Sequence, residues 1–401
     1  MDLLIKNARP MGAAPADILI RGGRIAAIGP DLEAPDLEAP GVAVEEGRGL
    51  IAIPGLVDAH THVDKGLLGY PWYVNEVGPR LIDKIDNERR VKRDLGLDAH
   101  VQSMRHVLLC LGQGTTLVRT HVDVDTDQGL AAIEGVQETR RLLAGQVEIE
   151  IVAFPQSGLL RRPGTVELLD AAMAAGADLV GGLDPCGMDR DPKGHCDAIF
   201  AIAEKHGKGL DIHLHEGGEL GAFSMEMIFE RIRALGMQGQ VAVSHAFCLG
   251  MPDWNAAQSL IDQCAELDVP ILTTAPPSRE VPSLKRLHAA GVRFGAGVDG
   301  FRDTWGPYGN GDMLERAMLL GMKNNLRRDD EVAMALHVCT TGGAQAMARL
   351  HHELKVGGRG DVVLVPGASL ADAVVSHARR ALVVTAGRVV ARDGATLTVA
   401  P

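Results

Sequence analysis

Residues 51–62, IAIPGLVDAHTH, form an apolar and β-branched run that ends in His60-Thr61-His62. Such a run predicts a buried strand that carries two imidazoles at its C-terminal end. Side chains of a strand alternate between its two faces, so residues two apart point the same way. His60 and His62 are therefore placed to bind one metal ion without distortion of the backbone.

The middle of the chain, roughly residues 52–350, alternates short apolar runs with longer amphipathic stretches. After the strand that precedes His60, further strands are predicted at 116–120, 150–154, 179–183, 209–214, 241–245, 269–274 and 292–297. Helix-like segments such as 166–175, 196–206 and 225–235 lie between them. Eight β/α units of this kind predict an α/β fold, a parallel (β/α)8 TIM barrel, in which active-site residues lie at the C-terminal ends of the strands.

The two ends of the chain resemble each other. Residues 17–29 and 381–391 each predict a strand, a glycine turn and a second strand, and residues 361–365 add one more strand. We therefore expect a small β-sandwich domain built from both termini, residues 1–52 and 355–401, around a catalytic barrel of residues 53–354. The Pro- and acid-rich stretch 34–40 is expected to be a surface loop of the small domain.

Composition excludes several classes of protein. The net charge of −12 argues against a nucleic-acid partner, which demands concentrated Lys and Arg. The six cysteines show no C-x-x-C pair, as expected of reduced thiols in a cytoplasmic protein. We find neither a signal peptide nor an apolar run long enough to span a membrane. A small-molecule substrate is expected, and assembly into a homo-oligomer is left open.

Further candidate ligands follow other predicted strands. His213 and His245 end two consecutive strands, and Asp299 follows the last one. A set of imidazoles with one carboxylate suits Zn²⁺ or Fe²⁺ and is too rich in nitrogen for Mg²⁺ or Ca²⁺. A divalent ion lowers the pKa of a bound water toward about 7, and a carboxylate such as Glu216, three residues after His213, can pass the water proton to a leaving nitrogen. The pattern predicts a metal-dependent hydrolytic enzyme.

Two neighbouring histidines have open roles. His121, in the predicted strand-end RTHVD (119–123), has either a structural role or a supporting role behind the metal ligands. His215 is expected to point away from the metal or to support its ligands, because one ion does not need it.

The sequence resembles the cytosine deaminase branch of the amidohydrolase superfamily, which includes N-isopropylammelide amidohydrolase. The resemblance spans nearly the whole chain. It is carried by PGLVDAHTHVDK (54–65), RTHVD (119–123), IVAFPQSG (151–158), DIHLHE (211–216), SHA (244–246) and the segment from residue 299 to residue 313.

This resemblance implies roles for single residues. It implies one metal ion, held by His60, His62, His213 and Asp299. Glu216 would be the proton shuttle, and His245 would polarise or orient the attacking water. Gln156 would hold the amide edge of the substrate ring, and Trp305 would form an aromatic wall of the pocket.

Two positions bear on the substrate. Cytosine deaminases usually carry a second acidic residue directly after the metal-binding Asp, and Gly300 stands there in this chain. We expect its lack of a side chain to open space. Lys65, which is similar to the triazine enzyme, either reaches a substrate carbonyl or pairs with Asp64 at the surface.

The leading expectation is hydrolytic deamination of a small cytosine-like ring, cytosine or a 5-substituted cytosine, with release of ammonia. The alternatives are an aminohydrolase of a triazine such as N-isopropylammelide and a hydrolase of a cyclic amide. A ligand-binding protein on a decayed fold is disfavoured, because the ligand set and Glu216 are all present.

Overall fold

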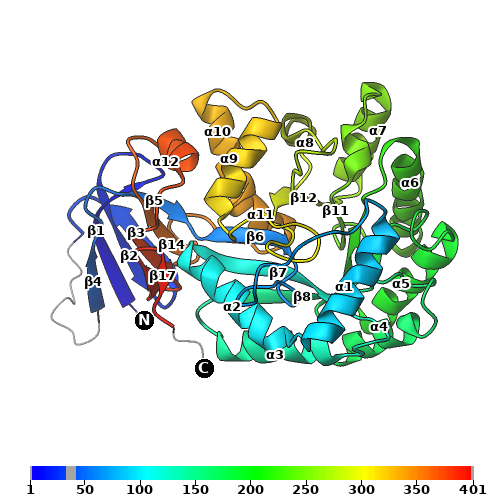
Figure 1. Cartoon of the computed structure of the whole chain (residues 1–401). Helices are drawn as coiled ribbons and strands as arrows, with labels where there is room; N and C mark the ends of the chain where they lie inside the picture. Colours follow the sequence, from blue (N-terminus) through cyan, green and yellow to red (C-terminus); the bar gives the residue numbers. More distant parts are fainter. Residues whose placement is uncertain (1, 33–41, 399–401) are drawn as a thin grey trace.

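The computed structural model describes residues 2–32 and 42–398. Within these ranges, two sheets and the helices around one of them account for the regular structure (Figure 1). The surface loop expected at residues 34–40 lies outside the described residues.

The larger part is a parallel barrel. In the part of the chain that the structure describes, its eight strands follow one another in sequence order: β6 (Leu56–Thr61), β7 (Thr115–Asp123), β8 (Glu148–Phe154), β9 (Leu179–Leu183), β10 (Gly209–His213), β11 (Val241–Ser244), β12 (Ile271–Thr273) and β13 (Phe294–Ala296). The segment after β13 returns to β6, where Asp299 N donates to His60 O at 2.9 Å and His62 N donates to Asp299 O at 3.0 Å. This closure places residue 299 directly beside His60 and His62.

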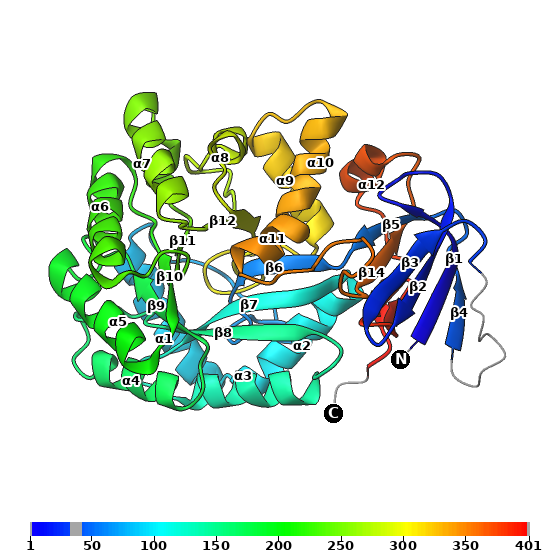
Figure 2. The ribbon, with the colours of Figure 1, turned by 180° about the vertical axis from the view of Figure 1, so that it is seen from behind.

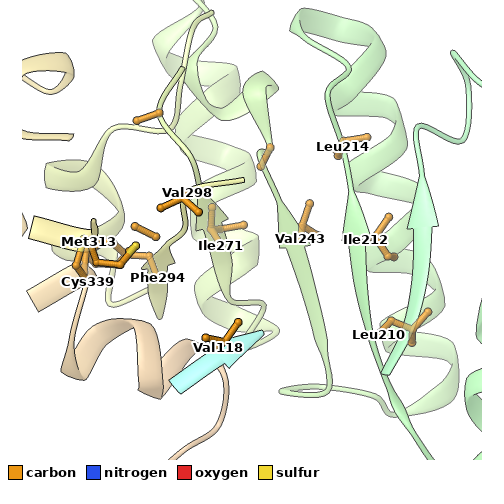
Figure 3. Close-up of a cluster of buried hydrophobic side chains, with 14 of the residues drawn as sticks. Val118, Leu210, Ile212, Leu214, Val243, Ile271, Phe294, Val298, Met313 and Cys339 are labelled. Atoms are coloured by element: carbon orange, nitrogen blue, oxygen red, sulfur yellow. The ribbon is translucent and has the colours of Figure 1, made fainter. Parts of the chain in front are cut away.

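Helices cover the outside of the barrel. They are α1 (Leu81–Leu95), α2 (Ala99–Gly112), α3 (Ala131–Leu142), α4 (Thr165–Ala174), α5 (Pro192–His206), α6 (Gly218–Leu235), α7 (Trp254–Glu266), α8 (Leu284–Ala290), α9 (Met313–Lys323), α10 (Asp329–Val338) and α11 (Thr341–Ala346), with a short 3-10 turn at Phe247–Gly250. Figure 3 shows Leu210 and Ile212 in β10, and Leu214 directly after it, in the apolar core around the barrel strands. Burial of this apolar surface is the main force that holds helices to strands.

Both ends of the chain meet in the second sheet. Its strands are β1 (Asp2–Pro10), β2 (Ala16–Arg21), β3 (Arg24–Gly29), β4 (Val42–Glu46), β5 (Ile51–Pro54), β14 (Val362–Val365), β15 (Leu382–Thr385), β16 (Arg388–Arg392) and β17 (Ala395–Thr396). The order is β17-β16-β15-β14-β5-β1-β2-β3, with β4 beside β1, and α12 (Leu370–Ser376) lies next to it (Figure 2). Ile5 and Ile20 from the first half share one apolar cluster with Val362 and Val384 from the second half.

The apolar run at 51–59, predicted as one strand, is two strands in two sheets. β5 pairs with β14 and β1, whereas β6 begins the barrel, and the break lies at Gly55. A Cβ on Gly55 would lie 2.1 Å from Thr116 Oγ1, so only glycine permits this close passage. The single-strand prediction was wrong here because alternation alone does not reveal a change of sheet.

The barrel and the sheet of terminal strands otherwise confirm the predicted fold class. The hairpin at 17–29 is β2 and β3, the one at 381–391 is β15 and β16, and 361–365 is β14. All six cysteines are free. Among the described residues, no helix has the length and apolarity that a bilayer span requires.

Candidate active site

Five predicted side chains meet at the C-terminal ends of the barrel strands. His60 and His62 come from the end of β6, His213 from the end of β10, His245 from the residue after β11, and Asp299 from the segment after β13. Ligand atoms of His60, His62 and His213 lie within 4.8 Å of one another, as do those of His60, His245 and Asp299. Strands far apart in sequence therefore supply one compact cluster, which we call the histidine cluster.

Hydrogen bonds fix the tautomers of the two β6 histidines. Ser244 donates its hydroxyl to Asp211 at 2.6 Å, so its oxygen accepts from His60 Nδ1 at 2.8 Å. His62 Nδ1 donates to the backbone oxygen of His121 at 3.0 Å. Each ring thus carries its proton on Nδ1 and presents a bare Nε2 lone pair to the centre of the cluster.

The Nε2 atoms of His60 and His62 converge on the other candidate ligands. His62 Nε2 lies 3.3 Å from His213 Nε2 and 3.4 Å from Asp299 Oδ1, and His60 Nε2 lies 3.5 Å from the same oxygen. His60 Nε2 is buried with no hydrogen-bond partner among the described residues. Lone pairs that face one another repel unless a cation lies between them, so this arrangement fits a divalent ion.

Burial keeps the histidine cluster in the form that binds metal. Loss of hydration lowers the pKa of His62 to about 4 and the pKa values of His213 and His245 well below their usual range. Burial acts to raise the pKa of Asp299, but the surrounding histidines outweigh it and hold that pKa well below its usual range. Neutral imidazoles and an ionised carboxylate are the forms that coordinate metal.

Backbone strain accompanies two of these residues. His245 and Asp299 have φ values of 67° and 68°, in the left-handed region that side chains other than glycine seldom adopt. Such strain concentrates at functional sites, where the surrounding structure holds it.

His121 lies inside the histidine cluster. Its ring centroid is 4.3 Å from that of His60 and 4.4 Å from that of His213, and its Nε2 lies 3.8 Å from Asp211 Oδ2. Asp211 also receives Arg119 Nη1 at 2.9 Å. Of the two roles left open for His121, its position favours support of the ligands from beneath.

His215 and Glu216, which follow β10, contact different groups. The ring of His215 lies 4.2 Å from that of His245, and its Nδ1 is 2.9 Å from Asp184 Oδ2. Glu216 accepts from Gly187 N at 2.6 Å and from the hydroxyl of Ser224. Burial raises the pKa of Glu216. From the sequence, we expected His215 either to point away from the metal or to support its ligands. The structure places His215 against the histidine cluster.

Lys65 is buried rather than exposed. Its Nζ donates to Gln156 Oε1 at 2.6 Å, to Asp123 Oδ1 at 2.8 Å and to Glu88 Oε1 at 3.4 Å. Burial alone would lower the pKa of Lys65, but Asp123 and Glu88 outweigh it and raise that pKa above its usual range. Two roles were left open for Lys65, contact with a substrate carbonyl and pairing with Asp64 at the surface. The second was wrong, because Lys65 does not lie at the surface.

Gln156 and Trp305 are joined through this lysine. Gln156 Oε1 accepts from Lys65, which leaves the Gln156 Nε2 group for another acceptor. Trp305 Nε1 donates to Glu88 Oε2, the other oxygen of the carboxylate that binds Lys65. The structure thus brings Lys65, Gln156 and Trp305 into one hydrogen-bonded group.

The space beside Gly300 is filled. A Cβ on Gly300 would lie 2.0 Å from Asp303 Oδ2. The expectation that Gly300 opens space was wrong, because a carboxylate from three residues later occupies it.

Sequence reasoning missed Asp184, Glu88 and Asp303. Asp184 follows β9 directly and carried the same strand-end signal as His213. Glu88 lies within helix α1, and Asp303 lies in a loop, so no periodic pattern marked either residue.

Comparisons with known proteins agree with this geometry. Residues 105–391 match the family Amidohydro_3, described as the amidohydrolase family. Over 412 aligned residues the chain is 30% identical to N-isopropylammelide isopropyl amidohydrolase of Pseudomonas sp. (strain ADP), covering 98% of both chains. The chain therefore belongs to the amidohydrolase family, whose members are metal-dependent hydrolases of C–N bonds.

Two solved structures are similar over nearly the whole chain. N-isopropylammelide isopropylaminohydrolase from Burkholderia multivorans ATCC 17616 shares 52% identity, with a TM-score of 0.94 over 99% of this chain and 100% of that one. 5-Methylcytosine deaminase from Klebsiella pneumoniae, liganded with 5-fluorocytosine, shares 24% identity, with a TM-score of 0.84 over 96% of this chain and 97% of that one. At that identity the second likeness shows the fold alone.

Proposed function

We propose that this enzyme hydrolyses the exocyclic C–N bond of an alkylamino-substituted triazine of the N-isopropylammelide type and releases the alkylamine. The observation that carries the proposal is the 52% identity, over essentially both full chains, with the isopropylaminohydrolase of Burkholderia multivorans. A cytosine was the first substrate expected from the sequence. The triazine alternative now has the better support, because the cytosine deaminase likeness is 24% identical.

In this proposal His60, His62, His213 and Asp299 hold one divalent ion, Zn²⁺ or Fe²⁺. Support comes from the bare Nε2 atoms of the β6 histidines and from Asp299 Oδ1, 3.4 Å from His62 Nε2. When bound, the ion supplies an acidified water at neutral pH.

The proposed proton transfers use three residues. His245 orients the attacking water, with its buried Nε2 lacking a partner among the described residues. Asp299 assists in removing the water proton, and Glu216 delivers a proton first to the adjacent ring nitrogen and then to the departing amine. The C–O bond forms as the ring C=N bond opens and its nitrogen takes the first proton. The exocyclic C–N bond then breaks as the amine takes the second proton, and the added oxygen becomes a ring carbonyl; the water supplies both protons. A carboxyl group with a raised pKa suits this role because it holds a proton closer to neutral pH.

Substrate binding is proposed for the group around Lys65. Gln156 donates through Nε2 to a ring carbonyl, and the buried Lys65 ammonium favours negative charge that develops on that oxygen. Trp305 forms a wall against the ring face. Gly300 contributes by lacking a Cβ, which would lie 2.0 Å from Asp303 Oδ2.

Identification of the released amine tests the proposal. The protein would be stripped with a chelator, reloaded with Zn²⁺ or Fe²⁺, and assayed with N-isopropylammelide, ammelide, cytosine and 5-methylcytosine. We expect isopropylamine from N-isopropylammelide, and loss of turnover in the stripped protein. Ammonia from a cytosine, with no turnover of a triazine, would overturn the proposal and restore the first expectation.

A further inference from the structure

The Asp303 side chain is held in one orientation by its own loop. Its Oδ1 accepts from Trp305 N at 2.8 Å and from Gly306 N at 3.0 Å, and its own N–H donates to Gly306 O at 3.3 Å. A side chain that closes such a turn has little rotational freedom. The second oxygen, Oδ2, therefore has a fixed direction.

That direction is toward Gly300. An ideal Cβ on Gly300 would lie 2.0 Å from Oδ2, so the carboxylate lies where a side chain on residue 300 would begin. Residue 300 follows Asp299 directly. The absence of a side chain at 300 is what allows a carboxylate from residue 303 to lie beside the histidine cluster.

The Asp303 side chain lines a cavity together with Leu67 and Tyr73. It is half-buried, and no described residue donates a hydrogen bond to Oδ2. Burial raises the pKa of Asp303, whereas the N–H groups of Gly306 and Trp305 and the charge of Lys65 act to lower it. Oδ2 can therefore accept a hydrogen bond from a bound N–H group.

We propose that Asp303 Oδ2 is the acceptor for a ring N–H of the substrate, so that the pocket selects cyclic ureides and amides that present C=O and N–H side by side. Gln156 Nε2 donates to the carbonyl, and Asp303 accepts from the adjacent N–H. The inference rests on the proposed function for the identity of the ring. A ring with its nitrogens in the fully aromatic form, lacking N–H, loses this contact.

The first test replaces one acceptor by a donor of the same shape. In Asp303→Asn the amide oxygen still closes the turn, while Oδ2 becomes an NH2 group. We expect kcat/KM for N-isopropylammelide to fall about 10- to 100-fold, as for loss of a hydrogen bond to a charged group. The dissociation constant of cyanuric acid, which carries the same C=O and N–H edge, should rise by a similar factor in calorimetry.

The second test displaces the Asp303 carboxylate by adding a side chain at residue 300. Gly300→Ala should displace Oδ2 and lower kcat/KM in the wild type, but should have little effect in an Asp303→Ala background, where nothing remains to displace. The matched control is Gly321→Ala in α9, where an added Cβ likewise meets nothing within 4 Å and no change is expected.

The outcomes separate this inference from the proposed function. Turnover of N-isopropylammelide that Asp303→Asn leaves within about two-fold of wild type would overturn the role of Asp303 alone. If the wild type instead acts on a cytosine, the proposed substrate is wrong, and the same variants are compared with that ring, which also carries an N–H. If Asp303→Asn does not fold, Gly300→Ala in the otherwise native chain decides the question.

Discussion

A relay of buried side chains sets the chemistry of His60. Arg119 holds Asp211, Asp211 accepts from Ser244, and Ser244 accepts from His60 Nδ1. Each contact fixes the next, and the relay ends in a bare Nε2 at the histidine cluster. Partners of this kind orient ligands and tune their basicity as much as the ligands themselves do.

Glu216 and His215 can be separated by substitution. Glu216→Gln should retain the bound metal and lower kcat by at least about 100-fold, because an amide cannot deliver the proton. His215→Asn, the matched variant beside it, should cost far less. Metal content by atomic absorption and single-turnover amine release would be measured for both. The reverse order of losses would transfer the proton shuttle to His215 and Asp184.

The sequence predicted the residues that end strands and missed those placed by tertiary contacts. His60, His213 and Asp299 could be found because a strand-end position in a parallel barrel implies a shared mouth. Glu88 could not, because its role depends on α1 bringing its carboxylate to both Lys65 and Trp305. The filling of the Gly300 space was equally hidden, since it depends on the turn that Asp303 closes.

Among the secondary-structure elements, α9 is anchored by a cap that serves two parts of the molecule. Asp312 caps the helix by accepting from Leu314 N at 2.8 Å and Glu315 N at 3.3 Å, and it also contacts the fully buried Arg380. Burial lowers the pKa of Arg380 to about 10. The cap therefore joins the barrel to the segment that leads into β15.

Loss of the Asp312 cap should lower the free energy of unfolding more than loss of an exposed helix cap. Asp312→Ala is expected to lower the free energy of unfolding by about 3–5 kcal/mol, because it leaves a buried guanidinium without its carboxylate. Asp253→Ala, which removes the exposed cap of α7, should cost about 1 kcal/mol. Urea unfolding of both variants measures the difference. Equal losses of unfolding free energy in the two variants would mean that the contact with Arg380 does not stabilise the fold.

At the scale of the whole molecule, buried neutral histidines should make the protein sensitive to acid. Burial lowers the pKa of His106 to about 3; the residue lies in α2 beneath Phe301, with ring centroids 4.2 Å apart. The unfolded chain takes up a proton on this histidine near pH 6.5, whereas the folded chain does not. The protein therefore has its full stability above pH 6.5. As the pH decreases from 6.5 toward 3, this residue lowers the free energy of unfolding by about 1.4 kcal/mol per pH unit.

The matched variant is His106→Asn, which does not titrate. Below pH 6 its stability should fall less steeply than that of the wild type, by the slope of one proton. Urea unfolding between pH 4.5 and 7.5 in the presence of a chelator would measure both slopes without a contribution from metal. Identical slopes would show that His106 is protonated in the folded protein.

The overall architecture was predictable to the level of two sheets, but not to the pairing within the terminal one. Repeated strand and helix patterns indicated the barrel, and hairpins at both ends indicated a sheet shared by the termini. The pairing of β14 with β5, which joins the halves of that sheet, has no local signature, because it connects segments about 300 residues apart.

This distant pairing has a consequence for biosynthesis. β5 leaves the ribosome early, whereas its neighbour β14 follows only after the whole barrel has been translated, on the order of 15–60 s later at 5–20 residues per second. Throughout that interval one edge of β5 has no strand to pair with, and an uncovered edge invites association with other nascent chains. The yield of this protein in cells should therefore depend on translation speed and on chaperones that shield the growing chain.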